Sequence, residues 1–313
     1  LEVKGIHVTG QNGTLECGTP LVPFRGRLRI AVLPGGHQIS PFSMGGGPMP
    51  ADRTIMIMNG GTLRLIGDSK NARWARIAHT ANPGDTEIVL ASDVPWSAGD
   101  RIVIAASSYD HREAEEVSIT SVSGRRLRIS SPLRFRHNGA ADRYTVGTKN
   151  WVIDQRAEVV NLSRNIQIYS AGNPEAMDRR GAHIMVMPGA YSYLDGVELA
   201  HMGRLGEMGR YPFHWHRAGD VSGQYIKNSS IHHSFQRCVT VHGTHNSRVE
   251  NNVCYDHFGH GFFLEDGNET GNHIVNNIGL LSRRPEAARA LLASDANIGS
   301  PERFPGPATF WIS

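Results

Sequence analysis

The stretch from Tyr211 to Gly267 decides the fold, because it repeats a short strand pattern around histidine. It reads Tyr211-Pro-Phe-His-Trp-His216, then Ser230-Ile-His-His233, Val239-Thr-Val-His242 and Asp256-His-Phe-Gly-His260, and it closes with Glu265-Asp266-Gly267. The chain has 16 histidines, and eight of them lie in this stretch. Neutral imidazole is the commonest transition-metal ligand and titrates near neutral pH. The stretch therefore predicts a repetitive β-fold that carries a chemical site.

The spacing of the pattern indicates a stacked coil. His216, His242 and Glu265 follow one another at intervals of 26 and 23 residues, which is within the range of solenoid repeats. Because side chains alternate along a strand, each rung sends one set inward and the other outward. The expected columns are Phe213, Val239, Phe262 and Thr309; His214, Thr240, Phe263 and Phe310; and His216, His242, Glu265 and Ile312.

A second register supports the same architecture. The segments that align without gaps are Asp195–His201, Lys227–His233, Asn251–His257 and Asn276–Ser282, and their last residues form a second expected column. Paired asparagines at 251–252 and 276–277 suit turns, because asparagine tolerates left-handed backbone. The sequence predicts an all-β chain with a right-handed parallel β-helix.

Composition excludes several classes of protein. A net charge of +3 argues against a strong nucleic-acid binder, and no run approaches the roughly 20 apolar residues of a membrane span. Arginines near the histidines, Arg204, Arg210 and Arg217, would attract an anionic polymer. We therefore expect neither a nucleic-acid partner nor membrane insertion of this form.

The first half of the chain predicts a separate all-β module. Short alternating strands separated by glycine turns run to about residue 148, so we expect one module over 1–148 and the β-helix over 149–313. Three cysteines cannot all pair, and Cys238 and Cys254 are expected to be buried as free, small apolar residues.

These residues resemble a known family. Arg73-Trp-Ala-Arg-Ile77, Asn82-Pro-Gly-Asp-Thr86, Trp96–Ile104 and Tyr109–Glu116 look like the eight-glycine domain of cell-migration-inducing hyaluronidase, its transmembrane relative and the fibrocystin-like proteins. The blocks Tyr211–Asp220, Ser230–Gly243 and Gly259–Gly267 resemble their β-helix. The resemblance implies an extracellular, secreted or cell-surface protein that binds or depolymerises hyaluronan or a related uronic-acid polymer, with a metal ion as a possible cofactor.

Three histidines are predicted to hold that metal. His214 and His216 lie two apart on one strand, and His242 lies on the adjacent rung of the same face, with Glu265 one rung further. Histidine ligation favours zinc, and it also suits copper, nickel or iron, while the carboxylates leave manganese open. The alternative is a column of polar residues bonded to one another.

Candidate catalytic groups lie around these ligands. His233, His257 or His260 would act as general acid or base, and Arg210 would neutralise a uronate carboxylate in an elimination. In a hydrolysis, Glu265 and Asp266 would supply acid and base, provided that the strand ends there. The expected substrate-binding residues are Tyr211, Arg217, Phe263 and Arg204.

The sequence thus predicts a glycosidase or lyase that cleaves an acidic polysaccharide with the help of a divalent transition metal. The competing interpretation is a non-catalytic carbohydrate-binding or adhesion module in which the metal is structural. A third interpretation is an enzyme that uses the same scaffold on a different substrate, because a fold does not fix a function.

Overall fold

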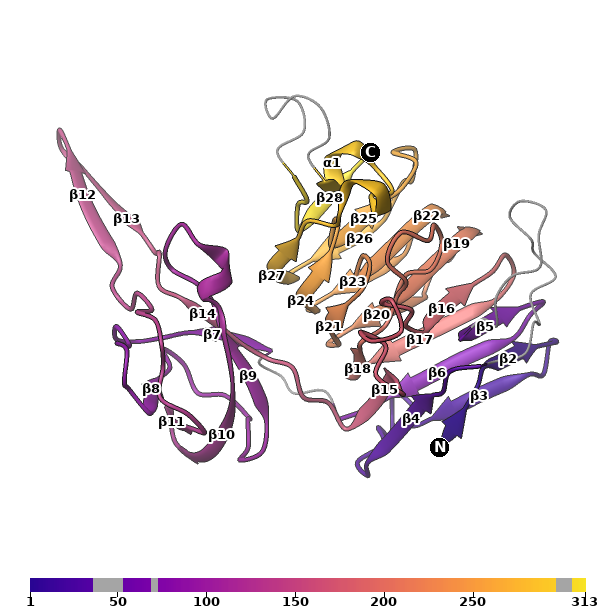
Figure 1. Ribbon diagram of the computed structural model, residues 1–313, viewed down its shortest axis with the longest axis horizontal. Coiled ribbons are helices and arrows are strands. Elements are labelled where there is room, and N and C mark those ends of the chain that lie inside the picture. Colours follow the sequence, from indigo (N-terminus) through magenta and orange to yellow (C-terminus); the bar gives the residue numbers. More distant parts are fainter. Residues whose placement is uncertain (36–52, 69–72, 297–305) are drawn as a thin grey trace. The chain divides into compact units, whose positions relative to one another are not determined.

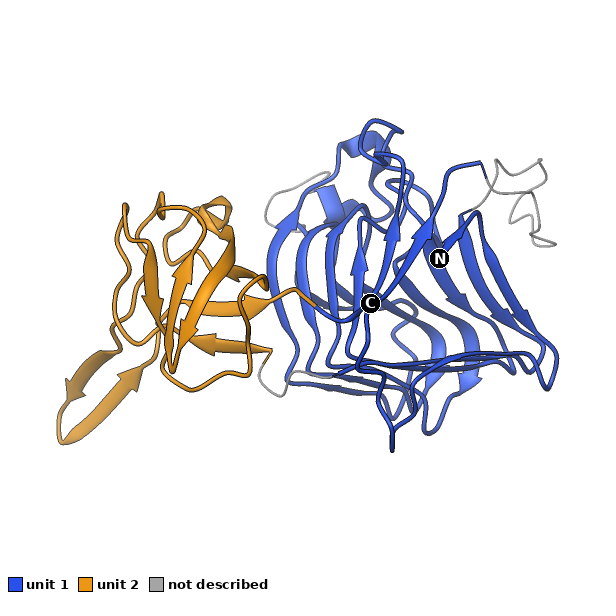
Figure 2. Cartoon of the chain, turned by 90° about the horizontal axis from the view of Figure 1, so that it is seen from below, with its two compact units in different colours: residues 1–69, 164–313 blue, residues 70–163 orange. Residues whose placement is uncertain are grey.

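The computed structural model describes residues 1–35, 53–68, 73–296 and 306–313. The chain divides into two compact units, residues 1–69 with 164–313, and residues 70–163 (Figure 2). The first unit is a parallel β-helix, and the second is an all-β insertion between two of its rungs. Among the described residues there is no helix long and apolar enough to cross a membrane.

Three parallel sheets form the walls of the β-helix (Figure 1). Sheet 1 contains β1 (Glu2–Val3), β4 (Leu28–Val32), β15 (Ile166–Ser170), β18 (Val197–Ala200), β21 (Ser230–Ser234), β24 (Val253–Phe258) and β27 (Ile278–Arg283). Sheet 2 contains β2 (Ile6–Thr9), β5 (Thr54–Met58), β16 (His183–Val186), β19 (Phe213–Asp220), β22 (Val239–His245), β25 (Phe262–Leu264) and β28 (Phe310–Ile312). Sheet 3 contains β3 (Thr14–Cys17), β6 (Thr62–Ile66), β17 (Tyr191–Asp195), β20 (Tyr225–Lys227), β23 (Arg248–Glu250) and β26 (His273–Val275).

Each rung takes one strand from each sheet in chain order, as β18, β19 and β20 do. Two short helical segments, η2 (Ala287–Arg289) and α1 (Ala293–Ala296), follow the last strand of sheet 1. Both segments lie after residue 283, and they have only 3 and 4 residues. The predicted parallel β-helix is therefore confirmed by the strand order and by the parallel pairing between rungs.

The inserted unit has its own sheet and core. Its strands are β7 (Trp74–Arg76), β8 (Glu87–Val89), β9 (Arg101–Ile104), β10 (Glu115–Ser123), β11 (Arg126–Ile129) and β14 (Glu158–Asn161), with the hairpin β12 (Asp142–Val146) and β13 (Lys149–Ile153) and the short helix η1 (His111–Glu113). A bridge between Ile77 and Leu90 joins the two edges, β7 and β8, so this sheet closes on itself. Closure leaves no open sheet edge at these strands.

The division of the chain differs from the expected modules 1–148 and 149–313. Strands β1 to β6, within residues 1–69, pair in parallel with β15, β16 and β17, so they are rungs of the same coil. The insertion interrupts the coil after its second rung and removes the periodic spacing that would reveal those first rungs in the sequence.

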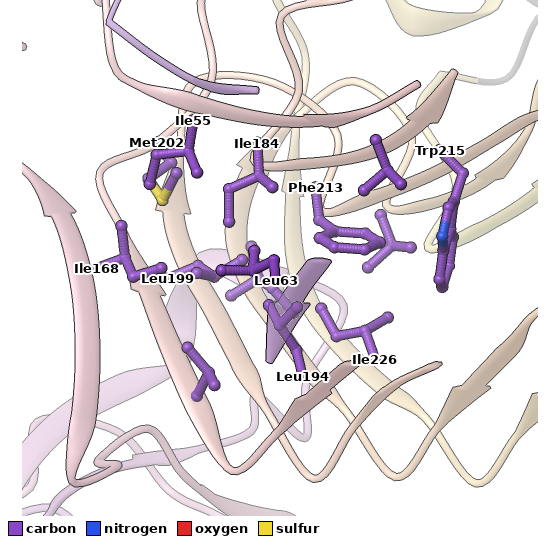
Figure 3. Packing of buried hydrophobic residues seen from close by; sticks show 14 of the residues in the cluster. Ile55, Leu63, Ile168, Ile184, Leu194, Leu199, Met202, Phe213, Trp215 and Ile226 are labelled. Carbon is purple, nitrogen blue, oxygen red and sulfur yellow. The ribbon is translucent and has the colours of Figure 1, made fainter. Parts of the chain in front are cut away.

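The coil is filled by one apolar core. Alternate residues of all three sheets point inward, as Ile184, Leu194 and Leu199 do (Figure 3). Phe213 and Trp215 are fully buried in this core, with ring centroids 4.6 Å apart. Burial of each such side chain stabilises the fold by about 2 kcal/mol. Their inward direction fixes the outward direction of the residues between and beside them on β19.

Stacked left-handed residues form the corners. Gly196, Asn228, Asn251 and Asn276 have φ of 66°, 56°, 55° and 54° at equivalent positions of successive rungs. The predicted turn role of the asparagine pairs is confirmed, because Asn251 and Asn276 supply this conformation. Their neighbours Asn252 and Asn277 bond to one another and to backbone carbonyls, which satisfies polar groups that face the interior.

Two parts of the expected register are wrong by one residue. Phe262 pairs with Phe310 rather than Thr309, so Phe263 lies beside Trp311. In the second register, His257 pairs with Ser234 rather than His233, and this places His233 beside Asp256. The expected alignment matched Lys227 with Asn251, whereas Lys227 pairs with Glu250. The column of His201 and His233 therefore continues into Asp256 and does not reach His257.

The expectation that Cys238 and Cys254 are free is also wrong. The two residues form a disulfide with their Cα atoms 6.0 Å apart, and both are fully buried. Cys17 is the remaining free cysteine. Cys238 directly precedes β22 and Cys254 lies on β24, so the bond links two neighbouring rungs of the coil.

Replacing both cysteines with alanine should lower the free energy of unfolding by about 3 kcal/mol, because the bond closes a loop between residues separated by 16 positions. Urea denaturation of the double variant and of the wild type measures this difference. Equal midpoints for the two proteins under non-reducing conditions would contradict the stabilising role.

Candidate metal centre

Sheet 2 brings three histidines together on its outer face. Phe213 and Trp215 point into the core, so His214 and His216 project outward from the same strand, β19. His242, on β22, pairs directly with His216 across the parallel ladder. One rung of the coil therefore supplies two of the histidines and the next rung supplies the third.

The ring nitrogens converge as ligands of one ion would. One nitrogen from each of His214, His216 and His242 lies within 4.8 Å of the other two. His216 Nδ1 and His242 Nδ1 are 3.2 Å apart. Two nitrogens bound to one tetrahedral ion at about 2.0–2.1 Å lie about 3.3 Å from each other. The spacing of this pair matches the bite of a metal ion.

His214 is held in the form that a metal ligand needs. Its Nδ1 lies 3.2 Å from the carbonyl oxygen of Gly209 and donates to it. This bond fixes the proton on Nδ1 and leaves a lone pair on Nε2. That Nε2 atom is buried and has no hydrogen-bond partner among the described residues. A buried polar atom without a partner is costly, so Nε2 is suited to accept an ion.

Burial keeps two of the three imidazoles neutral. Burial lowers the pKa of His214 well below its usual value, and the neighbouring His216 adds to the effect. Burial also lowers the pKa of His216 to about 4, and the charges of His242 and Arg217 act in the same direction. Both rings therefore carry free lone pairs at neutral pH, which is the state that binds a metal.

Two carboxylates lie on either side of His242. Glu265 Oε2 is 3.9 Å from its Nδ1, and Asp266 Oδ2 is 3.4 Å from its Nε2. Both reach the same ring because β25 ends at Leu264, so the alternation of a strand no longer separates them. Burial raises the pKa of Glu265, while the side chain of Asp266 is 41% exposed. The two carboxyl groups thus differ in burial, and Glu265 is the one whose ionised form is disfavoured.

Two of the predicted arginines border the cluster. Arg217 follows His216 directly, is exposed, and adopts φ of 49° where the strand bends. Arg210 is buried, at 6% exposure, and its charge lowers the pKa of both His214 and His216. Arg217 is thus the arginine that can contact a ligand from solvent, whereas Arg210 is buried and acts on the two histidines through its charge.

Three predicted substrate-binding residues are buried instead. Tyr211 and Phe263, at 1% and 2% exposure, both pack on the guanidinium of Arg237, with its centre 5.6 Å and 4.1 Å from their rings. Arg204 is 2% exposed and pairs with Glu207 at 3.2 Å. None of these side chains is placed to stack on or grip a polymer. Tyr211 does line the site from within, because its ring centroid lies 4.9 Å from that of His214.

The remaining predicted catalytic histidines do not join the cluster. His257 and His260 are fully buried. His257 bonds to Ser282 at 2.9 Å, and His260 bonds to Ser294 at 2.9 Å while stacking on Trp311. Cys238 and Cys254 lie close to His257, but their sulfur atoms are already bonded to each other. These two histidines are therefore part of the packing.

His233 lies at a different corner of the coil. Its ring is 5.1 Å from that of His201 and 5.5 Å from that of Tyr255, and its Nε2 is 3.8 Å from Asp256. The side chain is 26% exposed. His233 thus belongs to a corner column of its own and has no place in the triad of His214, His216 and His242.

One contributor to the site had no sequence signal. The backbone carbonyl of Gly209, in the connection between β18 and β19, orients His214. Every residue has a backbone carbonyl group, so the sequence does not show which one will reach His214. The path of the connection between β18 and β19 decides this. Gly209 itself has φ of 78°, a conformation that glycine adopts without strain.

Two family models match separate parts of this chain. Residues 179–313 match the family model "CEMIP beta-helix", and residues 1–78 match the family model "G8 domain". The chain therefore carries a G8 domain and a CEMIP β-helix, and the resemblance seen in the sequence is confirmed. The G8 match ends at residue 78, whereas most of the motifs that suggested this domain lie beyond it, between 82 and 116.

Fibrocystin-L and cell surface hyaluronidases are among the proteins similar to this chain. Mouse (Mus musculus) fibrocystin-L is 32% identical over 100% of this chain and 8% of its own length. Zebrafish (Danio rerio) cell surface hyaluronidase is 39% identical over 62% of the chain and 15% of its own length. Human (Homo sapiens) cell surface hyaluronidase CEMIP2 is 37% identical over 66% of the chain and 16% of its own length. The chain thus spans 8% to 16% of these relatives.

The burial of His257 predicts a pH dependence of stability. Burial holds its pKa at about 3 in the folded protein, compared with 6.5 for an ordinary histidine. As pH falls below 6.5 the unfolded chain takes up this proton first, so stability that is present above 6.5 is lost towards pH 3. We expect a loss of about 2 kcal/mol from this group between pH 7 and 5. Urea denaturation at a series of pH values measures it.

The matched variants are His257→Asn and His273→Asn. The first removes the buried imidazole and should flatten the loss of stability below pH 6.5, whereas the second replaces an exposed histidine on β26 and should leave the profile unchanged. A His257→Asn profile as steep as that of the wild type would contradict the assignment.

Proposed function

We propose that this chain binds and cleaves an acidic, uronic-acid-containing polysaccharide resembling hyaluronan, with the help of a divalent transition metal. The observation that carries the proposal is the convergence of His214, His216 and His242, with a buried, unpartnered Nε2 on His214. Three histidine ligands that leave a fourth coordination position free are typical of catalytic zinc sites. Glu265 and Asp266 lie beside His242.

The residues fit a borderline metal ion. Three nitrogen donors favour zinc, and copper, nickel or iron would bind the same set. A carboxylate oxygen of Glu265 lies 3.9 Å from Nδ1 of His242, and carboxylate ligands would also suit manganese. When bound, such an ion supplies a fixed positive charge that stabilises negative charge developing on the substrate.

Charge supports an acidic polymer as the substrate. Arg217 is exposed beside His216, and a guanidinium recognises a carboxylate through two parallel hydrogen bonds. Two similar proteins bear the name cell surface hyaluronidase, and both align with more than half of this chain. On this basis we place the protein outside the cell, either secreted or at the cell surface, and infer a polysaccharide partner.

The carboxyl groups divide the acid and base roles. Glu265 has a raised pKa because it is buried, so it can hold a proton for the leaving glycosidic oxygen. Asp266 is more exposed and can orient a water molecule in a hydrolysis. In an elimination, Arg217 would neutralise the uronate and a base would take the adjacent proton. Both routes use the same face of sheet 2.

One observation favours a second function. His214 is 1% exposed, and a ligand buried this deeply can hold a metal whose role is to stabilise the fold. The same cluster would then belong to a carbohydrate-binding or adhesion module without catalysis. The two functions differ in whether any polymer is cleaved.

The test is incubation of the protein, with each candidate metal supplied, with a panel of uronic-acid polymers. Ultraviolet absorbance of unsaturated ends reports elimination, and a reducing-end assay reports both elimination and hydrolysis. We expect cleavage of at least one polymer, and a rate about 100-fold lower in His216→Ala and His242→Ala, because each removes a group that stabilises the reacting charge.

A matched control is His273→Ala, which removes an exposed histidine on sheet 3 and should retain the wild-type rate. Elemental analysis should find the metal in the wild type and in the control and much less of it in the two cluster variants. Binding of a polymer without any product would favour the adhesion module, and full metal content in both cluster variants would refute the site.

A further inference from the structure

The outer face of sheet 2 carries methionines next to the histidine site. Met56 and Met58 lie on β5, Met185 lies on β16, and Met187 follows that strand directly. These four residues, which we call the methionine ladder, form a cluster of their own outside the interior core. They occupy two successive rungs, each with the pattern Met-x-Met, ahead of the rung with His214-x-His216.

Strand pairing puts the thioethers in line with the imidazoles. Met56 pairs with Met185, and Met185 pairs with His214. His7 pairs with Met56 at the other end of this column. Val186 pairs with Trp215, so Met187 is the next residue along and lies beside His216. Each rung is displaced from the next by about 4.8 Å.

Met185 and His214 meet at one point of the overlying connection. A Cβ atom placed on Gly209 would lie 3.7 Å from Met185 Cε and 4.0 Å from His214 Cε1. The methyl end of the thioether and the imidazole ring are therefore neighbours around the same backbone segment. Met185 and Met187 are 7% and 9% exposed, so these two side chains are shielded from bulk water, as His214 is.

The sulfur and nitrogen atoms of these two neighbouring rungs indicate which metal ion they would bind. Thioether sulfur is a soft ligand and binds copper(I) in preference to harder divalent ions, whereas imidazole binds copper in both of its common states. Apolar packing alone does not require sulfur at all four positions, since leucine and isoleucine serve in the core of the same coil. Metal–sulfur bonds of about 2.3 Å allow side chains on adjacent rungs to share one ion.

We propose that Met185 and Met187, together with His214 and His216 on the next rung, form a copper(I) site. The inference rests on the histidine site of the proposed function and adds a second mode of metal binding to it. The three imidazoles alone bind a divalent ion, whereas the sulfur atoms of Met185 and Met187 favour reduced copper, shared with the histidines of the next rung. Met56 and Met58 continue the sulfur lining by one rung, towards His7.

The test measures affinity for copper(I) and for zinc in the absence of any polysaccharide. Copper(I) affinity is obtained anaerobically, under a reductant, by competition with a chromophoric chelator. The variant Met185→Leu/Met187→Leu removes both sulfur atoms with little change in side-chain volume and keeps the fold. It should bind copper(I) at least about 10-fold more weakly than the wild type, while zinc affinity stays unchanged.

Met202→Leu is the matched control, because Met202 is fully buried in the interior core and lies away from the ladder. Its copper(I) affinity should equal that of the wild type. X-ray absorption of the copper(I)-loaded wild type should show sulfur at about 2.3 Å, and this signal should be lost in the double variant.

An equal loss of copper(I) affinity in Met202→Leu, wild-type affinity in the double variant, or a copper shell without sulfur would overturn the proposal. None of these outcomes depends on polymer cleavage. A protein that binds copper(I) through sulfur but cleaves no polymer would contradict the proposed function alone, and one that cleaves polymer but ignores the methionine substitutions would contradict the copper(I) site alone.

Discussion

The structure depends on parallel pairing of successive rungs in a fixed register. Adjacent strands lie about 4.8 Å apart, and each side chain stands beside its partner on the next rung. The pairing of β19 with β22 thus brings His216 and His242 together although 26 residues separate them. Phe213 and Trp215 hold this register, because slipping β19 by one residue would expose both rings and turn the histidines into the core.

Burial then determines the chemistry of the cluster. Desolvation keeps His214 and His216 neutral at physiological pH, and the carbonyl of Gly209 leaves one imidazole nitrogen directed into the site. The same effect raises the pKa of Glu265. Two rungs and the connection that contains Gly209 thus bring together three imidazoles and a partly buried carboxyl group.

Sequence reasoning reached the β-helix and the histidine triad, because both follow from strand alternation and a regular interval. It misplaced His257, because it aligned Lys227 with Asn251 although Lys227 pairs with Glu250, and this shifts the whole segment by one residue. It also predicted that Tyr211 and Phe263 would contact substrate at the surface, although both are buried. The segments that cover the outer face of sheet 2 do not follow the repeat, so the sequence did not reveal this cover. The disulfide and the first rungs of the coil were not predicted either, because both depend on which distant segments become neighbours in the fold.

The most direct measurement is anomalous diffraction from crystals grown with Zn²⁺, recorded on both sides of the zinc absorption edge. The account predicts a peak about 2.0–2.1 Å from His214 Nε2 and from one ring nitrogen each of His216 and His242. Strong zinc peaks elsewhere with none between these three rings, or the three imidazoles found on separate faces of the coil, would contradict it.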